Sequence, residues 1–215
     1  MNRTGFADIG SALDDFSRLQ FVIQQAINGM ATATVVEVKA VDGGTVDVLP
    51  LVSQIDGKDT GVPHNTIHGM PYFALQAGVS AVLLKPKVGD IGLAVFCHSD
   101  ISSVKATKKA ALPASRRRYA WADGIYLGGL PMMNAAPTQF IELDDDEGIT
   151  IQATSGRKIK LIGDVEITGN VDHTGNLHSS GTITGDTDVI AAGKSGKTHT
   201  HSGVQSGSGN TGAPN

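Results

Sequence analysis

Two histidines near the C-terminal end, His199 and His201, are the residues whose types and spacing best suit a chemical role. In an extended strand, residues i and i+2 face the same side, so both imidazoles would point one way. Two imidazoles from one chain are too few for a convincing metal site. If three chains met on a threefold axis, six neutral nitrogen donors would converge in two stacked triangles. That arrangement suits a divalent transition metal such as iron, nickel or cobalt better than zinc, which prefers four ligands.

A short His-x-His pair is a weak motif by itself, because two exposed histidines in a polar tail would look the same. The position of this pair, directly after a repeat, favours the metal site. A second pair, His64 and His68, is four residues apart. Pro63 and Gly69 argue against a helix at that place, so a solvated loop is the better interpretation there.

The segment that must position the two histidines is a six-residue repeat that runs from Val165 to Lys194. A branched apolar residue opens each of its five hexads, and glycine holds the fifth place in four of them. These residues are Val165, Val171, Leu177, Ile183 and Val189, and Gly169, Gly175, Gly181 and Gly193. Because six is an even number, a strand returns the same face to the core at every repeat. The glycines allow bends between short strands.

One apolar residue in six is too little for this segment to fold alone, since a β-coil needs several stacked turns to enclose a core. A hexapeptide β-helix uses about three hexads per coil, so this repeat would give fewer than two coils. Several copies of the chain could instead wind together and share one core, and a threefold axis is the natural symmetry. A flexible tail rich in Gly, Ser and Thr is the remaining alternative.

The composition favours an extended, β-rich protein. The chain has 215 residues, of which 27 are glycine, and only 5% are aromatic. Its net charge of −4 gives no overall attraction to nucleic acid. The single cysteine, Cys97, excludes an intrachain disulfide. The sequence has no apolar secretion core and no run of 18 apolar residues, so we expect synthesis in a cytosol and no membrane-spanning helix.

The N-terminal half predicts a helix followed by short strands. Apolar residues recur at spacings of three and four over residues 8–30, which predicts a helix. Alternation on both sides of the turn signal at residues 42–44 predicts a β-hairpin. Residues 53–70 are expected to form a long loop. Strands return over residues 71–99, and this spacing suits a small closed barrel such as the five-stranded OB-fold.

The basic run Arg116-Arg117-Arg118 is expected to be a solvated or interface element. Tyr119 and Trp121 lie beside it, but single-stranded nucleic acid needs a basic groove, and no second basic strand is present. The acidic run at residues 144–147, followed by Gly148, is expected to be the tip of a hairpin.

The predicted fold class is therefore all-β with a short N-terminal helix. The expected domains are the helix at residues 1–30, an OB-fold collar at 31–130, a needle at 131–197 and a metal-binding apex at 198–215. In the needle, three chains are expected to wind together around one shared core.

Two segments resemble one known protein family. The terminal sequence THTHSGVQSGSGNTGAP is the more specific, and KVGDIGLAVFCHSDIS in the expected barrel is a looser match. Both are similar to the central baseplate spike proteins of contractile-tailed bacteriophages, the membrane-puncturing needles of the tail tip. The resemblance implies an all-β homotrimer with an OB-fold collar, an intertwined trimeric triple-stranded β-helix as the needle, and a pointed apex. It also implies one iron ion (Fe²⁺) per trimer, held by six histidine nitrogens from His199 and His201.

The implied function is structural. The spike would sit in the virion at the tip of the tail baseplate, bound to the baseplate hub and tail tube proteins, and would pierce the host outer membrane. It would be made in the host cytoplasm. Some members carry a lysozyme domain, for which this chain has no room, so we expect no enzyme activity and no nucleic-acid partner. The alternatives are a trimer resembling the hexapeptide-repeat acyltransferases and an OB-fold module that binds nucleic acid.

Overall fold

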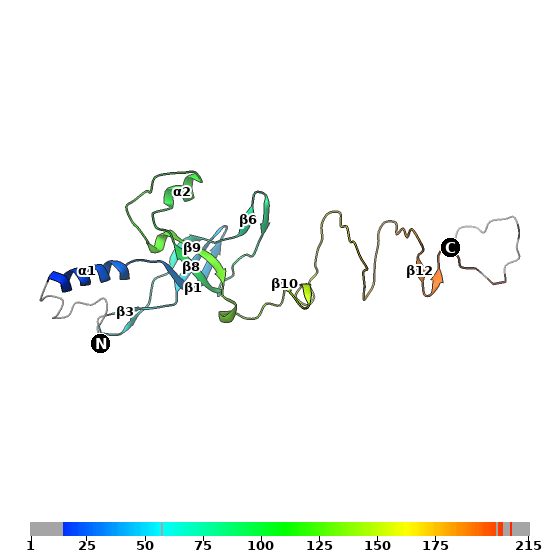
Figure 1. The fold of residues 1–215 in the computed structure, drawn as a ribbon, viewed down its shortest axis with the longest axis horizontal. Helices are drawn as coiled ribbons and strands as arrows, with labels where there is room; N and C mark the ends of the chain where they lie inside the picture. The colour runs from blue at the N-terminus through cyan, green and yellow to red at the C-terminus, as the bar shows by residue number, and fades with distance from the viewer. Residues whose placement is uncertain (1–14, 57, 201, 204–206, 208–215) are drawn as a thin grey trace. The chain divides into compact units, whose positions relative to one another are not determined.

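The chain is mostly β-structure with a few short helices. The structure is a computed structural model that describes residues 15–56, 58–200, 202–203 and 207. Its contacts divide the chain into two compact units, residues 1–159 and residues 160–215 (Figure 1). Each unit is described by itself below.

The first unit is built on a five-stranded antiparallel sheet in the order β5-β2-β1-β8-β9. The strands are β1 (Ala33–Asp42), β2 (Thr45–Pro50), β5 (Ile67–Pro71), β8 (Ile91–Phe96) and β9 (Gly124–Gly129). The two ends of the sheet also meet. Tyr72 forms a parallel bridge to Tyr126, and the Phe73 N–H donates to the Tyr126 carbonyl at 2.7 Å. This strand order, with a parallel closing contact, is compatible with the predicted OB-fold.

The core of this unit follows the period-two pattern of the sequence. In β2 and β8, buried residues alternate with half-buried ones, as expected when one face of each strand lines a core. The buried hydrophobic residues of the core are Ala31, Val36, Val38, Val46, Val48, Met70, Ala94, Phe96 and Tyr126. Full burial of a Val side chain stabilises a fold by roughly 1.5–3 kcal/mol. The predicted hairpin of β1 and β2 is confirmed, with Gly43 at its turn at φ +54°.

Two glycines in the sheet are required by close approach. A Cβ on Gly92 would overlap the Gly128 carbonyl oxygen and the Tyr126 hydroxyl. A Cβ on Gly124 would overlap the Met70 methyl group and the Phe96 ring. Both positions therefore let large core side chains pack directly against the backbone.

The described part of the first unit contains three further two-stranded hairpins, two between strands of the sheet in sequence and one after β9. They are β3 (Gln54–Ile55) with β4 (Gly61–Val62), β6 (Leu75–Ala77) with β7 (Ser80–Val82), and β10 (Phe140–Asp144) with β11 (Gly148–Gln152). The loop expected over residues 53–70 is thus wrong in part, since it contains β3, β4 and the start of β5. The acidic hairpin tip is confirmed, because the Asp144 carboxylate accepts the N–H groups of Asp146 and Glu147 at 2.9 Å each.

The N-terminal helix α1 spans Asp15–Asn28, inside the predicted range, and residues 8–14 lie outside the described residues. None of its residues is buried. The other helices are short: α2 (Ser102–Thr107), η2 (Trp121–Asp123) and η3 (Pro131–Met133). In the part of the chain that the structure describes, no helix has the length and apolar character needed to cross a bilayer.

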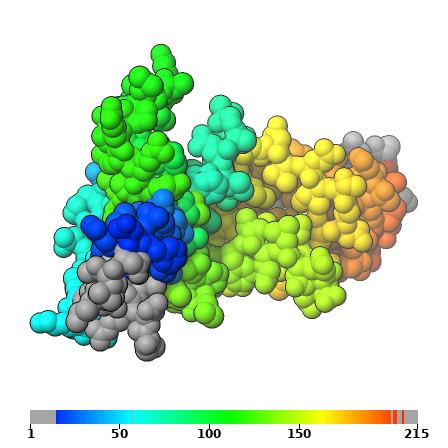
Figure 2. All heavy atoms as spheres, turned by 60° about the vertical axis from the view of Figure 1, so that its left-hand side comes forward, coloured from blue at the N-terminus to red at the C-terminus, as the bar shows by residue number. Residues whose placement is uncertain are grey.

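The loop that carries α2 projects from the sheet (Figures 1 and 2) and is held there by Arg117. The Arg117 Nε donates to Asp123 at 2.6 Å, and a terminal nitrogen donates to Asp100 at 2.7 Å. Both carboxylates are buried, with side chains only 1% exposed. Arg117 is itself exposed, as expected for a solvated or interface run, but its guanidinium pairs with two buried carboxylates. A buried carboxylate requires a cation or several donors, and the run supplies the cation.

In the second unit, the hexad repeat leaves its signature in the backbone. Gly163, Gly169 and Gly175 lie six residues apart and share a similar left-handed φ of +123°, +136° and +121°. Over the described residues of this unit, the only strands within one chain are β12 (Ile190–Ala191) and β13 (Lys194–Ser195). The apolar residue that opens each hexad is exposed, from 49% for Val189 to 76% for Leu177. The structure of one chain thus leaves this row of side chains uncovered.

Candidate functional site

His199 follows the β12–β13 hairpin and is anchored to it by two hydrogen bonds. Its backbone N–H donates to the Ser195 carbonyl oxygen at 3.2 Å, and its ring Nδ1 lies 2.9 Å from the same oxygen. A carbonyl oxygen can only accept, so Nδ1 must carry the proton. In the neutral ring this places the lone pair on Nε2, the nitrogen able to bind a metal ion.

The second predicted ligand, His201, lies outside the described residues. Among the residues that are described, no group of three or more His, Cys, Asp or Glu side chains from one chain could hold a metal ion. A complete site at this place would therefore need ligands from His201 and from further copies of the chain.

Asp188 is the acceptor around which the hairpin before His199 is built. Its Oδ1 accepts the N–H of Val189 at 2.8 Å and that of Lys197 at 3.1 Å. The Ser195 hydroxyl also hydrogen-bonds to this carboxylate and, with the backbone N–H donors, lowers the pKa of Asp188. Stabilisation of the charged form by several donors is the expected cause. Sequence analysis missed this residue, because its role depends on a hairpin register that composition does not reveal.

Ser195 links Asp188 to the histidine. Its hydroxyl oxygen accepts the N–H groups of Lys197 at 3.1 Å and Thr198 at 2.9 Å, while its carbonyl accepts from His199. The turn is also tight, because the Gly196 N–H donates to the Val189 carbonyl at 2.8 Å. A Cβ on Gly196 would come within 3.0 Å of that oxygen. Residues 188–199 therefore form a compact element that fixes the His199 ring.

The segment that contains His199 and His201 matches a known family model. The family model described as the GpV Apex motif matches residues 195–215, which include His199 and His201. The match supports the assignment of this chain as a spike component of a bacteriophage tail baseplate. It covers about a tenth of the chain, and the barrel lies outside it. No curated protein matches the chain.

The second histidine pair does not form a comparable site. His68 lies on β5, is largely exposed, and its Nδ1 is 2.6 Å from the Asp47 carboxylate. The His64 ring instead packs against Trp121 with 4.6 Å between ring centroids. The hydrogen bond to His68 is the largest cause of the lowered pKa of Asp47. The two rings thus have separate structural partners.

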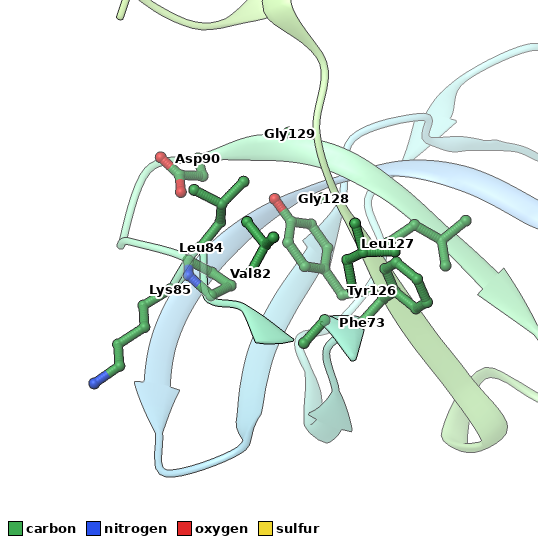
Figure 3. Close-up of a pocket in the computed structure, with 12 residues that line it drawn as sticks. Phe73, Val82, Leu84, Lys85, Asp90, Tyr126, Leu127, Gly128 and Gly129 are labelled. Atoms are coloured by element: carbon green, nitrogen blue, oxygen red, sulfur yellow. The ribbon is translucent and has the colours of Figure 1, made fainter. Parts of the chain in front are cut away.

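A cavity of about 320 Å³ opens on the barrel beside the β6–β7 hairpin (Figure 3). Its wall is mostly apolar, with Phe73, Val82, Leu84 and Leu127 among the lining side chains. Tyr126 also lines it. The Tyr126 hydroxyl is buried, has no hydrogen-bond partner among the described residues, and has its pKa raised by that burial. The charged residues that line this cavity are Lys85 and Asp90.

Proposed function

We propose that this chain forms a homotrimeric spike at the tip of a contractile phage tail and that it pierces the host outer membrane. Its role is mechanical rather than enzymatic. The observation that carries the proposal is the GpV Apex motif at residues 195–215, placed directly after a six-residue repeat that cannot enclose a core by itself. The barrel acts as an OB-fold collar that docks on the baseplate hub and the tail tube.

The uncovered apolar row supports the trimer. Val165, Ile167, Val171, Leu177 and Ile183 are all more than half exposed in a single chain. Burial of each such side chain against neighbouring chains would contribute roughly 1.5–3 kcal/mol. Three chains that wind together would share these residues in one core and pair their backbones along the whole length. Such a three-chain assembly has no free sheet edge along its length, which makes it stiff and resistant to aggregation.

The donor set at the apex fits a bound iron ion. The His199 ring has its Nδ1 proton held by the Ser195 carbonyl, so Nε2 is the nitrogen that would bind. With His201, three chains would supply six imidazole nitrogens, a set that suits six-coordinate Fe²⁺. The ion, when bound, supplies a clamp between chains where little apolar surface is available.

Two other functions compete with this proposal. A hexapeptide-repeat acyltransferase would need more repeats than residues 165–194 provide. An OB-fold module for nucleic acid would need exposed aromatic residues and a basic groove. Here Trp121 packs on Phe96 and His64, and Arg117 is neutralised by Asp100 and Asp123. These contacts favour the spike.

The double substitution His199→Ala with His201→Ala tests the metal in this proposal. We expect iron, measured by elemental analysis of the purified protein, to fall from one ion per three chains to background. Because the ligands lie outside the barrel, the melting transition of the barrel should stay unchanged. His64→Ala with His68→Ala is the matched control and should keep the iron. Stoichiometric iron in the apex variant would contradict the assignment.

A further inference from the structure

We infer that Asp188 is a positioning residue for the apex metal, which it serves by fixing the turn that orients His199. This inference rests on the proposed function. Asp188 lies outside the matched Apex motif and is eleven positions before His199 in the sequence. In the structure, two links join the carboxylate to the imidazole. The Lys197 N–H lies 3.1 Å from both the Asp188 Oδ1 and the Ser195 hydroxyl oxygen, and the Ser195 carbonyl accepts from the His199 ring.

The first link fixes the backbone of the turn. One carboxylate oxygen of Asp188 accepts the N–H groups of Val189 and Lys197, which lie at the two ends of the hairpin. Hydrogen bonds to a charged acceptor are stronger than neutral ones. The Asp188 carboxylate therefore closes the hairpin at its base, next to the Gly196–Val189 backbone bond.

The second link fixes the ring. The Ser195 carbonyl accepts both the backbone N–H and the Nδ1–H of His199, so its direction sets both the ring orientation and the tautomer. That carbonyl belongs to the residue whose hydroxyl oxygen shares the Lys197 N–H with Asp188. If the turn opened, the carbonyl would move away and its hold on the ring would be lost. Partners of this indirect kind typically change metal affinity by about 10–100-fold.

The test compares Asp188→Ala with Asp188→Asn in the full-length trimer. Each purified protein is loaded with ferrous iron and then mixed with phenanthroline, whose coloured ferrous complex reports the rate of metal loss. We expect Asp188→Ala to lose iron at least about tenfold faster than the unchanged protein. Asp188→Asn keeps an oxygen that can accept the same N–H groups, so it should lie close to the unchanged protein. Gel filtration before the assay confirms that each variant is still a trimer.

Asp186→Ala is the matched control, because it removes the same charge from the same loop and the Asp186 carboxylate makes no hydrogen bond to a described residue. It should release iron at the unchanged rate. Fast loss from Asp186→Ala as well would show an effect of charge and overturn the inference. Unchanged loss from Asp188→Ala would overturn it too, as would equal loss from Asp188→Asn and Asp188→Ala. An unchanged protein that takes up no iron would instead refute the metal of the proposed function.

A second readout separates positioning from mere stability. Cobalt(II) bound in place of iron has a visible absorption spectrum that depends on ligand geometry. We expect the spectrum of Asp188→Ala to shift or broaden and that of Asp186→Ala to match the unchanged protein. Identical spectra for all variants would contradict a positioning role.

Discussion

At the scale of single residues, the barrel depends on a few polar side chains that are buried and fully bonded. Asp100 and Asp123 are both inside the fold, and Arg117 bridges them from a neighbouring loop. Leaving either carboxylate without its donors would strand a buried charge, which is among the most destabilising changes a small domain can suffer. The loop that carries α2 is thus locked to the sheet by charge rather than by apolar packing.

This network predicts acid sensitivity of the barrel. Donors from Ser102, then Ser115, and the Arg117 guanidinium lower the pKa of Asp100 from 3.8 to about 2. A depressed pKa stabilises the folded state above the unfolded value and loses that contribution as protons bind. The melting temperature of the barrel should therefore fall as the pH decreases from about 4 to about 2. Scanning calorimetry between pH 6 and pH 2 measures it.

The substitution Asp100→Asn tests whether Asp100 causes this loss of stability at low pH. The variant should melt lower than the unchanged protein at pH 6, and its melting temperature should change less between pH 4 and pH 2. Asp145→Asn, at the exposed hairpin tip, serves as the control and should follow the unchanged curve. Parallel curves for Asp100→Asn and the unchanged protein would show that another group causes the acid sensitivity.

At the scale of elements, the sequence predicted those parts whose pattern is local. The β1–β2 hairpin and the acidic tip between β10 and β11 follow from alternation and turn residues a few positions apart. The Arg117 network could not be predicted, because one partner, Asp100, lies 17 positions away and a run of arginines ordinarily faces water. Asp188 was missed for the same reason, since its partners meet only after the hairpin forms.

The hexad repeat predicts that association of the chains depends on its exposed apolar residues. Leu177, 76% exposed in one chain, opens the third hexad and should face the shared core. In the assembly, Leu177→Asp would remove three buried side chains and bury three carboxylates, at a cost of at least about 5 kcal/mol per trimer. We expect the trimer to dissociate or fail to form, as judged by light scattering.

Ser180→Asp provides the matched control, because position 180 faces the opposite side of the same hexad. It should remain trimeric. If Leu177→Asp also stayed trimeric with an unchanged melting temperature, the row would face solvent and the repeat would not be a shared core.

At the scale of the whole molecule, a folded barrel is followed in the sequence by a segment that is incomplete in one chain. The barrel encloses its own core, with Val36, Val48 and Tyr126 at most 1% exposed. The repeat instead leaves its apolar residues uncovered, and the described residues of one chain's apex carry too few ligands for a metal ion. The association of three chains that we propose would remove both deficits. The apex motif and the repeat thus support one function, a stiff pointed spike.

Native mass spectrometry of the purified full-length protein, combined with elemental analysis, tests whether three chains associate around one metal ion. We predict a single species of three 22.2 kDa chains that carries one iron ion and loses it only when the protein is denatured. A metal-free species with the mass of one chain would contradict the spike, since neither the repeat nor the apex could then be completed.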